Sequence, residues 1–228
     1  MHTKYSGDSL IDPEKVPSYM CRKGLRGIAI TDHDTIEGGR TAKEIIQAQG
    51  CKDCIIIVGT EIKTEIGDII GLFLTREIHS RRSLDVIDEI HSQGGLSILA
   101  HPFRTPYILH ARGKKTANYE ATLIQQIDLI EIANARSKPS ENLMAMDLAL
   151  RYHKPVSAGS DAHFPPEIGA TRLITTDQDI STETDIKNHL LNATGIPSNK
   201  HPILNNLHWY VVTALLSYMH KLKQTFLP

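Results

Sequence analysis

Residues 27–34 read GIAITDHD, a short apolar run that ends in a histidine between two carboxylates. The β-branched composition and the brevity of Gly27–Asp32 are typical of a strand that is buried on both faces of a parallel sheet. Five further runs share this character: Ile55–Glu61, Asp68–Leu74, Leu96–His101, Leu129–Ala133 and Pro155–Asp161. The sequence therefore predicts six short buried strands.

Helical patterns separate most of these runs. They cover Gly39–Gln49, Ser83–Gln93, Tyr119–Gln126, Ser140–Tyr152 and Thr184–Leu191. Repeated alternation of strands and helices indicates a parallel α/β architecture, which a barrel and an open doubly wound sheet satisfy equally. No GxGxxG opens the first strand–helix turn, and this disfavours a dinucleotide-binding fold. In the fourth helix we expect four side chains to face the core, namely Leu143, Met146, Leu148 and Leu150.

Composition narrows the class of protein. The 228 residues fit one larger domain or two small ones, and a 40% hydrophobic content supports a packed core. A net charge of −1 without a long basic run disfavours a nucleic-acid partner without eliminating it. Three cysteines do not make a disulfide framework, so we expect a reducing, cytoplasmic setting and interpret the CxxC of Cys51 and Cys54 as ordinary thiols.

The two ends of the chain differ in character. Residues 1–10 contain no apolar stretch of the kind that a secretory signal requires. Leu207–Leu222 has an apolar run that is too short to span a membrane, and we expect a packing or dimerisation helix there, after a linker at Pro197–Asn206. The predicted organisation is a catalytic domain over residues 1–195, followed by a linker and an amphipathic helix over residues 196–228.

Histidines and carboxylates recur where the predicted strands end. His33, Glu61 and His101 end the first, second and fourth strands, and Asp161 and His163 end the sixth. Active sites of parallel α/β folds are built from the carboxyl ends of strands and the loops that follow. Imidazole and carboxylate ligands suit zinc, manganese or iron, and a carboxylate such as Glu61 can bridge two ions. The pattern predicts a divalent-metal site with a hydroxide nucleophile between two ions.

At this point the sequence resembles the PHP (polymerase and histidinol phosphatase) family. The resemblance spans roughly residues 1–195. Five segments carry it in the family's order: HTKYSGD at residues 2–8, TDHDT at 31–35, GTE at 59–61, AHP at 100–102 and GSDAH at 159–163. It implies a distorted TIM-like, seven-stranded β/α barrel that holds two or three divalent ions.

The resemblance also implies a distribution of ligands. His2 and Asp161 would hold one ion, which Glu61 bridges to a second ion at His101. A third set would consist of Asp8, His33 and His163.

Two positions depart from the family pattern. The family's first motif is His-x-His after a strand, and this sequence begins at Met1, so the resemblance places one more strand and histidine before His2. Many relatives also have a histidine where this chain has Asp68, which can still bind a metal but equally suits a solvent-facing strand position.

The leading hypothesis is hydrolysis of a small phosphomonoester or phosphodiester, with Glu61, Asp161 and His101 at the reacting centre. Arg104 and Arg136 follow strand ends and could bind phosphate oxygens bidentately. Asp32 or Asp34 could orient a ligand histidine. Two alternatives stay open: an amidohydrolase-like enzyme that cleaves C–N or C–O bonds, and a non-catalytic PHP-like accessory module.

Overall fold

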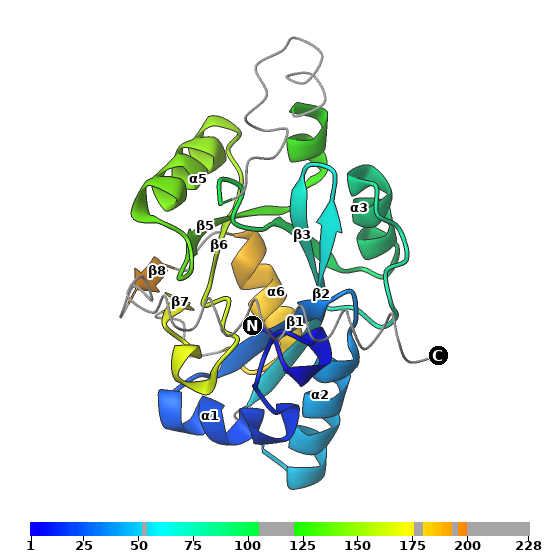
Figure 1. Ribbon diagram of the computed structural model, residues 1–228, viewed down its shortest axis with the longest axis vertical. Coiled ribbons are helices and arrows are strands. Elements are labelled where there is room, and N and C mark those ends of the chain that lie inside the picture. The colour runs from blue at the N-terminus through cyan, green and yellow to red at the C-terminus, as the bar shows by residue number, and fades with distance from the viewer. Residues whose placement is uncertain (52–53, 105–120, 176–179, 193–195, 200–228) are drawn as a thin grey trace.

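A computed structural model describes residues 1–51, 54–104, 121–175, 180–192 and 196–199. Its main feature is a six-stranded sheet that curls into a half barrel, in the order β1-β2-β3-β4-β5-β6 (Figure 1). The strands are β1 (Gly27–His33), β2 (Ile55–Thr64), β3 (Gly67–Leu72), β4 (Leu96–Leu99), β5 (Leu129–Asn134) and β6 (Val156–Gly159). The six predicted strands are thus confirmed as elements. The seventh strand of the expected barrel stays a prediction.

Helices cover the outside of the curled sheet and one end of its interior (Figure 1). They are α1 (Val16–Lys23), α2 (Glu37–Gln49), α3 (Ser83–Ser92), α5 (Pro139–Arg151) and α6 (Glu183–Leu191). A helical segment also covers residues 121–126. Three short 3-10 turns are η1 (Lys4–Ser6), η2 (Pro13–Lys15) and η4 (Pro165–Glu167). The sequence patterns predicted all of the longer helices except α1.

The expectation of an all-parallel sheet is wrong at β3. This strand pairs antiparallel with both β2 and β4, whereas the other neighbouring strands are parallel. Only Glu65 and Ile66 separate β2 from β3. A parallel connection needs a crossover of about a dozen residues, so this short turn enforces a hairpin. As a result, β3 and its predicted ligand Asp68 start at the same end of the sheet as Glu61 of β2.

A small second sheet lies beside β6. It pairs β7 (Thr171–Ile174) antiparallel with β8 (Ile196–Asn199). Pro197 therefore lies in a strand, although the sequence suggested that a linker begins there. The expected helix at Leu207–Leu222 lies outside the described residues.

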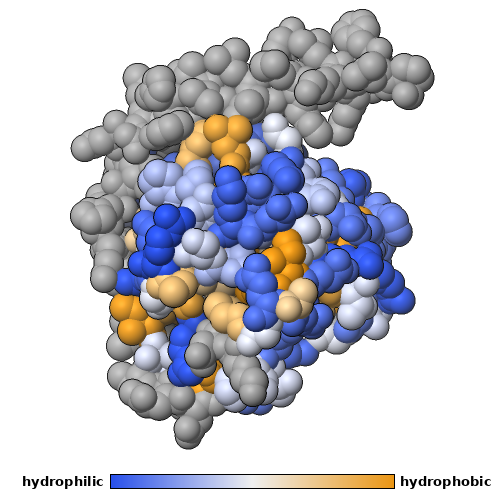
Figure 2. Space-filling model, turned by 90° about the horizontal axis from the view of Figure 1, so that it is seen from below, coloured by the Kyte–Doolittle hydropathy of each residue, from blue (hydrophilic) through white to orange (hydrophobic). Residues whose placement is uncertain are grey.

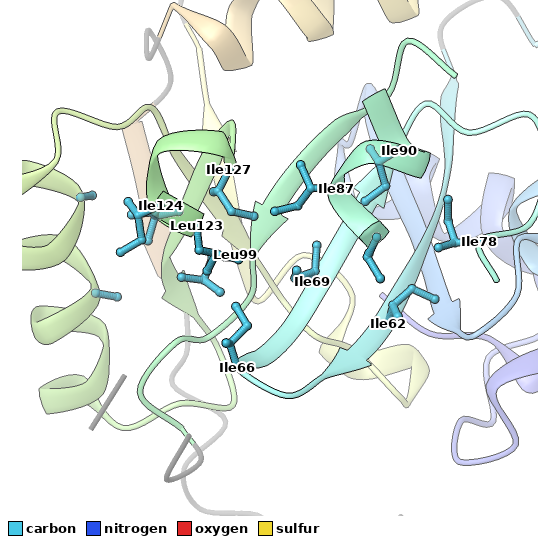
Figure 3. Packing of buried hydrophobic residues seen from close by; sticks show 14 of the residues in the cluster. Ile62, Ile66, Ile69, Ile78, Ile87, Ile90, Leu99, Leu123, Ile124 and Ile127 are labelled. Atoms are coloured by element: carbon cyan, nitrogen blue, oxygen red, sulfur yellow. The ribbon is translucent and has the colours of Figure 1, made fainter. Parts of the chain in front are cut away.

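The core divides according to strand alternation. Val58 and Ile62 of β2 face outward and pack with Ile69 and Leu99 against α3 and α5 (Figure 3). Ile57 points into the half barrel, where apolar side chains of the strands, such as Ile98, pack with Ile186 of α6. Successive side chains of a strand point to opposite faces, which explains why one short strand serves two cores.

The predicted core face of α5 is wrong in three of its four members. Leu143 is 70% exposed and Leu150 67% exposed, and Met146 is also exposed. The helix instead packs through Ala145, Leu148 and Ala149, at the i, i+3, i+4 spacing of a helix face. The small alanines let the helix approach the sheet, so the larger apolar residues were a misleading signal.

Among the described residues seen from below, most are hydrophilic, and the apolar ones form separate patches (Figure 2). Among the described residues, no helix combines the length and the apolar character that a membrane span requires.

Candidate metal centre

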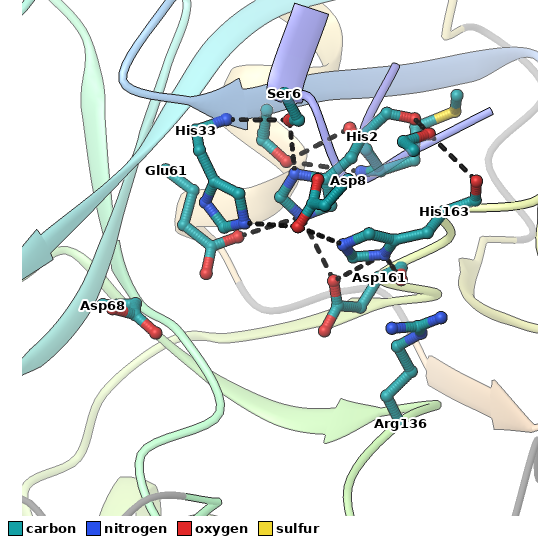
Figure 4. A network of polar contacts seen from close by, with 12 residues as sticks. His2, Ser6, Asp8, His33, Glu61, Asp68, Arg136, Asp161 and His163 are labelled. Atoms are coloured by element: carbon teal, nitrogen blue, oxygen red, sulfur yellow. Dashed lines mark hydrogen bonds and ion pairs between the residues drawn. The ribbon is translucent and has the colours of Figure 1, made fainter. Parts of the chain in front are cut away.

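The eight predicted ligands converge on one end of the half barrel, although they come from six parts of the chain. Figure 4 shows how His2, Asp8, His33, Glu61, Asp161 and His163 point toward one another, with Asp68 beside them. The eight residues form three groups whose ligand atoms lie within 4.8 Å of one another. The groups are His2, Asp8, His33 and His163; His2, Glu61 and Asp161; and Glu61, Asp68 and His101. His2 and Glu61 each belong to two groups, so the three form one continuous centre.

Glu61 joins two of these groups through its two oxygens. Its Oε2 lies 3.2 Å from His2 Nε2, and its Oε1 lies 3.1 Å from His101 Nε2. His2 Nε2 is also 3.1 Å from Asp161 Oδ1. Asp68 Oδ2 lies farther away, 3.9 Å from His101 Nε2. A carboxylate that offers one oxygen to each of two ligand groups has the geometry of a bridging ligand.

The remaining group surrounds Asp8. Its Oδ2 lies 3.3 Å from both His33 Nε2 and His163 Nε2. The His2 ring packs between the other two imidazoles, with centroids 4.4 Å from His33 and 4.3 Å from His163. Within the described part of the chain, no donor contacts the buried Asp8 Oδ1. Buried polar atoms are normally paired, so this oxygen fits a cation that the group would hold.

The N-terminal segment is fixed by Asp32, as expected for a residue that orients a ligand. Its Oδ1 accepts hydrogen bonds from Thr3 N and Ser6 Oγ, and its Oδ2 accepts one from Thr3 Oγ1. Ser6 Oγ also contacts His2 Nδ1 at 3.1 Å. This contact leaves His2 Nε2 facing the carboxylates. The other candidate, Asp34, instead pairs at the surface with Arg81.

Two of the predicted ligands follow their strands in unusual backbone conformations. β4 ends at Leu99 and β6 at Gly159, so His101 and Asp161 lie in the turns beyond them. Their φ angles are +27° and +48°. Non-glycine residues rarely adopt positive φ, and such strain clusters at functional sites.

The electrostatics favour ionised carboxylates at the centre. Burial opposes ionisation of Glu61, but hydrogen bonds from His101 and His2 hold the pKa of this carboxyl well below its usual range. Burial has the same effect on Asp161, where the Arg104 charge and the His2 hydrogen bond keep the pKa well below the ordinary value. Asp68 differs, because burial and the Glu61 charge raise its pKa.

The histidines are shifted in opposite directions. Burial disfavours the charge on His33, yet the hydrogen bond to Asp8 and the charge of Glu61 raise its pKa to about 10. His163 is driven the other way, because burial and the neighbouring His2 lower its pKa. A metal ligand must be a neutral imidazole, so metal binding at His33 would release a proton.

The two predicted phosphate-binding arginines lie in different surroundings. Arg104 reaches into the centre, where Nη1 donates to Asp161 Oδ2 and Nη2 lies 2.8 Å from His101 Nε2. Arg136 is largely buried, and its Nη2 lies 3.3 Å from Glu167 Oε1. Glu167 Oε2 in turn accepts a hydrogen bond from His163 N. Arg136 therefore also braces the loop that carries His163.

Two polar residues at the centre have no role assigned from sequence. Glu131 and Asn134 of β5 are 5% and 2% exposed, and both contact ligand residues. Regular β-strand alternation would put residues three apart on opposite faces of the sheet, so the apolar pattern of this strand gives no signal that the two side chains lie together. Together with Glu61 and His101, they line a cavity of about 600 Å³, which is large enough for a small-molecule substrate.

The sequence model of the PHP domain family matches residues 1–166 of this chain, and the sequence model of a PHP-associated region matches residues 139–194. The chain belongs to the PHP family. The resemblance seen in the sequence motifs is thereby confirmed. Members of the PHP family are generally metal-dependent hydrolases.

Sequence relatives differ in how much of their length the chain matches. The chain is 35% identical to the uncharacterized protein MJ1587 of Methanocaldococcus jannaschii over 146 residues, which make up 59% of this chain and 79% of the relative. It is 38% identical over 80 residues to the 5'-3' exoribonuclease Rnm of Salmonella typhimurium, covering 35% of this chain and 26% of that protein. The second match therefore involves only part of the PHP domain and a quarter of the relative.

Solved structures share the PHP-type fold. A two-domain protein from Bacteroides vulgatus, which contains a predicted PHP-like metal-dependent phosphoesterase, superimposes with a TM-score of 0.70 at 18% identity, over 87% of this chain and 63% of that one. An amidohydrolase from Chromobacterium violaceum, solved with sulfate and no metal, gives a TM-score of 0.58 at 16% identity, over 86% and 95% of the two chains. At these identities the likeness establishes the fold alone.

Proposed function

We propose that this chain hydrolyses a small phosphomonoester or phosphodiester with the help of two or three divalent metal ions. One observation carries the proposal: three groups of imidazoles and carboxylates meet at one end of the half barrel and share Glu61 and His2. Five of the participating side chains are almost fully buried, namely His2, Glu61, His101, Asp161 and His163. Burying so many ionisable groups is costly unless they bind ions or one another, so packing alone is a poor explanation.

The residues would divide the work by position. Bound divalent ions would supply a nucleophile from water near neutral pH and neutralise the phosphate. Glu61, Asp161 and His2 would hold the ions nearest the nucleophile, and His101 with Asp68 would hold the neighbouring one. Asp8, His33 and His163 would form the third set. Arg104, the more exposed arginine, would bind a nonbridging phosphate oxygen, and Arg136 would be the second arginine that contacts the phosphate.

Metal removal tests the proposal directly. Chelation should abolish turnover of an aryl phosphate, and manganese, zinc or iron should restore it. Glu61→Gln is the matched variant, because it keeps the shape of the side chain but removes the negative charge. Undiminished hydrolysis after complete demetallation would overturn the assignment.

A panel of substrates separates the rival reactions. The match to an exoribonuclease supports phosphodiester cleavage, and the amidohydrolase structure keeps C–N hydrolysis as the second candidate. Aryl phosphate, bis-aryl phosphate, a short RNA and an aryl amide should be compared at equal metal loading. Cleavage of the amide alone would favour the amidohydrolase reading. Fewer than one bound ion per chain would favour a non-catalytic accessory module.

Further parts of the proposal concern the setting of the enzyme. We propose a seven-stranded barrel as the complete fold, a cytoplasmic location on the basis of the few cysteines, and no membrane partner. The segment Leu207–Leu222 offers an apolar run that a homo-oligomer could use. Small-angle scattering of the full chain and of a chain ending at residue 199 tests this last point.

A further inference from the structure

The strand β5 contains an irregularity next to the metal centre. Glu131 pairs with Ser157 of β6, and Ala133 pairs with the next residue, Ala158. Ile132 is therefore an extra residue, which is the definition of a β-bulge. Its buried side chain packs in the outer core. Regular alternation would place residues 131 and 134 on opposite faces of the sheet, and the bulge brings both side chains to the inner face.

Glu131 holds the turn that carries His101. Its Oε2 accepts a hydrogen bond of 2.9 Å from His101 N, the backbone atom of a residue with a φ of +27°. Gly159 leaves room for this carboxylate, because a Cβ atom at that position would lie only 2.5 Å from Glu131 Oε1. Glu131 belongs to none of the three ligand groups among the described residues.

Asn134 extends the same contact to the other strained ligand. Its Nδ2 donates to Glu131 Oε2 at 3.0 Å and to Asp161 Oδ2 at 3.4 Å. Asp161 has a φ of +48°. Asn142 of α5 holds the backbone of Asn134 on both sides, because its Oδ1 accepts from Asn134 N and its Nδ2 donates to Asn134 O.

We propose that Glu131 and Asn134 are a positioning pair, which the bulge at Ile132 brings together and which sets the spacing between His101 and Asp161. The pair comes from β5, whereas the two ligands follow β4 and β6 on either side of it. It therefore ties the backbone of one turn to the side chain of the other, in addition to the contacts that Arg104 makes with both residues. This inference rests on the proposed metal-dependent function, since it assigns the pair to the geometry of that centre.

The contacts also separate positioning from direct metal binding. A single oxygen of Glu131 accepts both hydrogen bonds, from His101 N and from Asn134 Nδ2. A glutamine can place its amide oxygen at the same point, and its amide nitrogen can occupy the place of Oε1. Glu131→Gln should therefore preserve the positioning role, whereas metal binding that depends on the negative charge of the carboxylate would be lost in this variant as in Glu131→Ala.

The experiment measures manganese binding to the full-length chain. Mn²⁺ affinity and stoichiometry are determined by calorimetry, and the Mn²⁺ EPR spectrum reports the coordination geometry. Glu131→Ala and Asn134→Ala should each lower the affinity for one ion by about 10- to 100-fold, which is the usual effect of losing a group that orients a ligand. Each should also change the EPR spectrum. Glu131→Gln should recover most of the affinity and the native spectrum.

Two further variants complete the test. Asn134→Asp replaces the donor with a third carboxylate beside those of Glu131 and Asp161, and should weaken binding at least as much as Asn134→Ala. Ile132→Val is the control, because it removes a buried methylene from the same bulge without touching a ligand, and its spectrum should remain native.

The outcomes of this experiment are distinct. Native affinity and spectrum in Glu131→Ala overturn the positioning pair, and so does a Glu131→Gln variant that is as impaired as Glu131→Ala. If the unmodified chain binds no manganese, the proposed function itself fails, whatever the variants do.

Discussion

Replacing Arg104 with leucine is expected to lower the stability of the metal-free protein and, at the same time, to increase its affinity for metal. The guanidinium donates to Asp161 Oδ2 and contacts His101 Nε2 at 2.8 Å. Asp161 and His101 both belong to the candidate metal-binding groups. A metal ion at His101 Nε2 and Asp161 would lie beside the positively charged guanidinium, and the two positive charges would repel each other. Arg104 therefore competes with the ion for His101.

The magnitude follows from the contacts. Hydrogen bonds to charged groups contribute about 1.5–3 kcal/mol. The Arg104 side chain is 31% exposed, so solvent screening favours the lower end of this range. A loss of about 1.5 kcal/mol lowers the melting temperature of a chain of this size by roughly 3–6 °C. Relief of the same competition should increase the affinity for one ion about tenfold.

Calorimetry with Mn²⁺ and thermal denaturation with and without the metal test both effects. Arg81→Leu is the matched control, because Arg81 pairs with Asp34 at the surface and touches none of the metal-binding groups. The reasoning is refuted if Arg104→Leu binds manganese no more tightly than the unmodified chain. Turnover gives an independent measurement, since loss of a phosphate contact should raise the KM for an aryl phosphate.

Three other substitutions or conditions test separate parts of the centre. Glu61→Gln should lower the affinity for two ions together and reduce phosphatase turnover by more than about 100-fold, because both ions would share the charge that the variant loses. Elemental analysis that shows full metal occupancy in this variant would contradict the prediction. Because the pKa of His33 is raised to about 10, metal affinity should increase with pH towards that value, and the metal-free chain should lose the corresponding stability between about pH 6.5 and 10. Calorimetry across this range should show a weaker pH dependence in His33→Gln, and an unchanged dependence would count against it. Gly38→Ala should destabilise the chain by about 1–3 kcal/mol in urea unfolding, since its Cβ would lie 1.9 Å from Asp32 Oδ2; native stability would show that this packing is looser.

The sequence predicted the strands well because each is a short β-branched run with clear boundaries. Its failures have identifiable physical causes. The antiparallel direction of β3 follows from a two-residue turn at Glu65 and Ile66, a signal that the apolar pattern alone does not contain. On α5, the large residue Leu143 suggested a core face that the small residues Ala145 and Ala149 actually form.

The sequence identified the candidate ligands because histidine and carboxylate side chains at strand ends have few structural reasons to recur. Their grouping was a different matter. His2 Nε2 lies 3.1 Å from Asp161 Oδ1, although the two residues are 159 positions apart in the chain. The sequence gives no direct measure of such a distance, and the family resemblance supplied the pairing only as an expectation.

The amino-acid sequence by itself determined the α/β class, most of the regular elements and the chemical types gathered at the strand ends, because these depend on local composition and periodicity. Only the tertiary structure decided that Glu61 offers one oxygen to each of two groups, that Arg104 reaches His101, and that a bulge turns Asn134 toward Asp161. These relations depend on the curvature of the sheet, the strand register and the backbone of the turns. They are set by packing among distant segments, which no local pattern in the chain encodes.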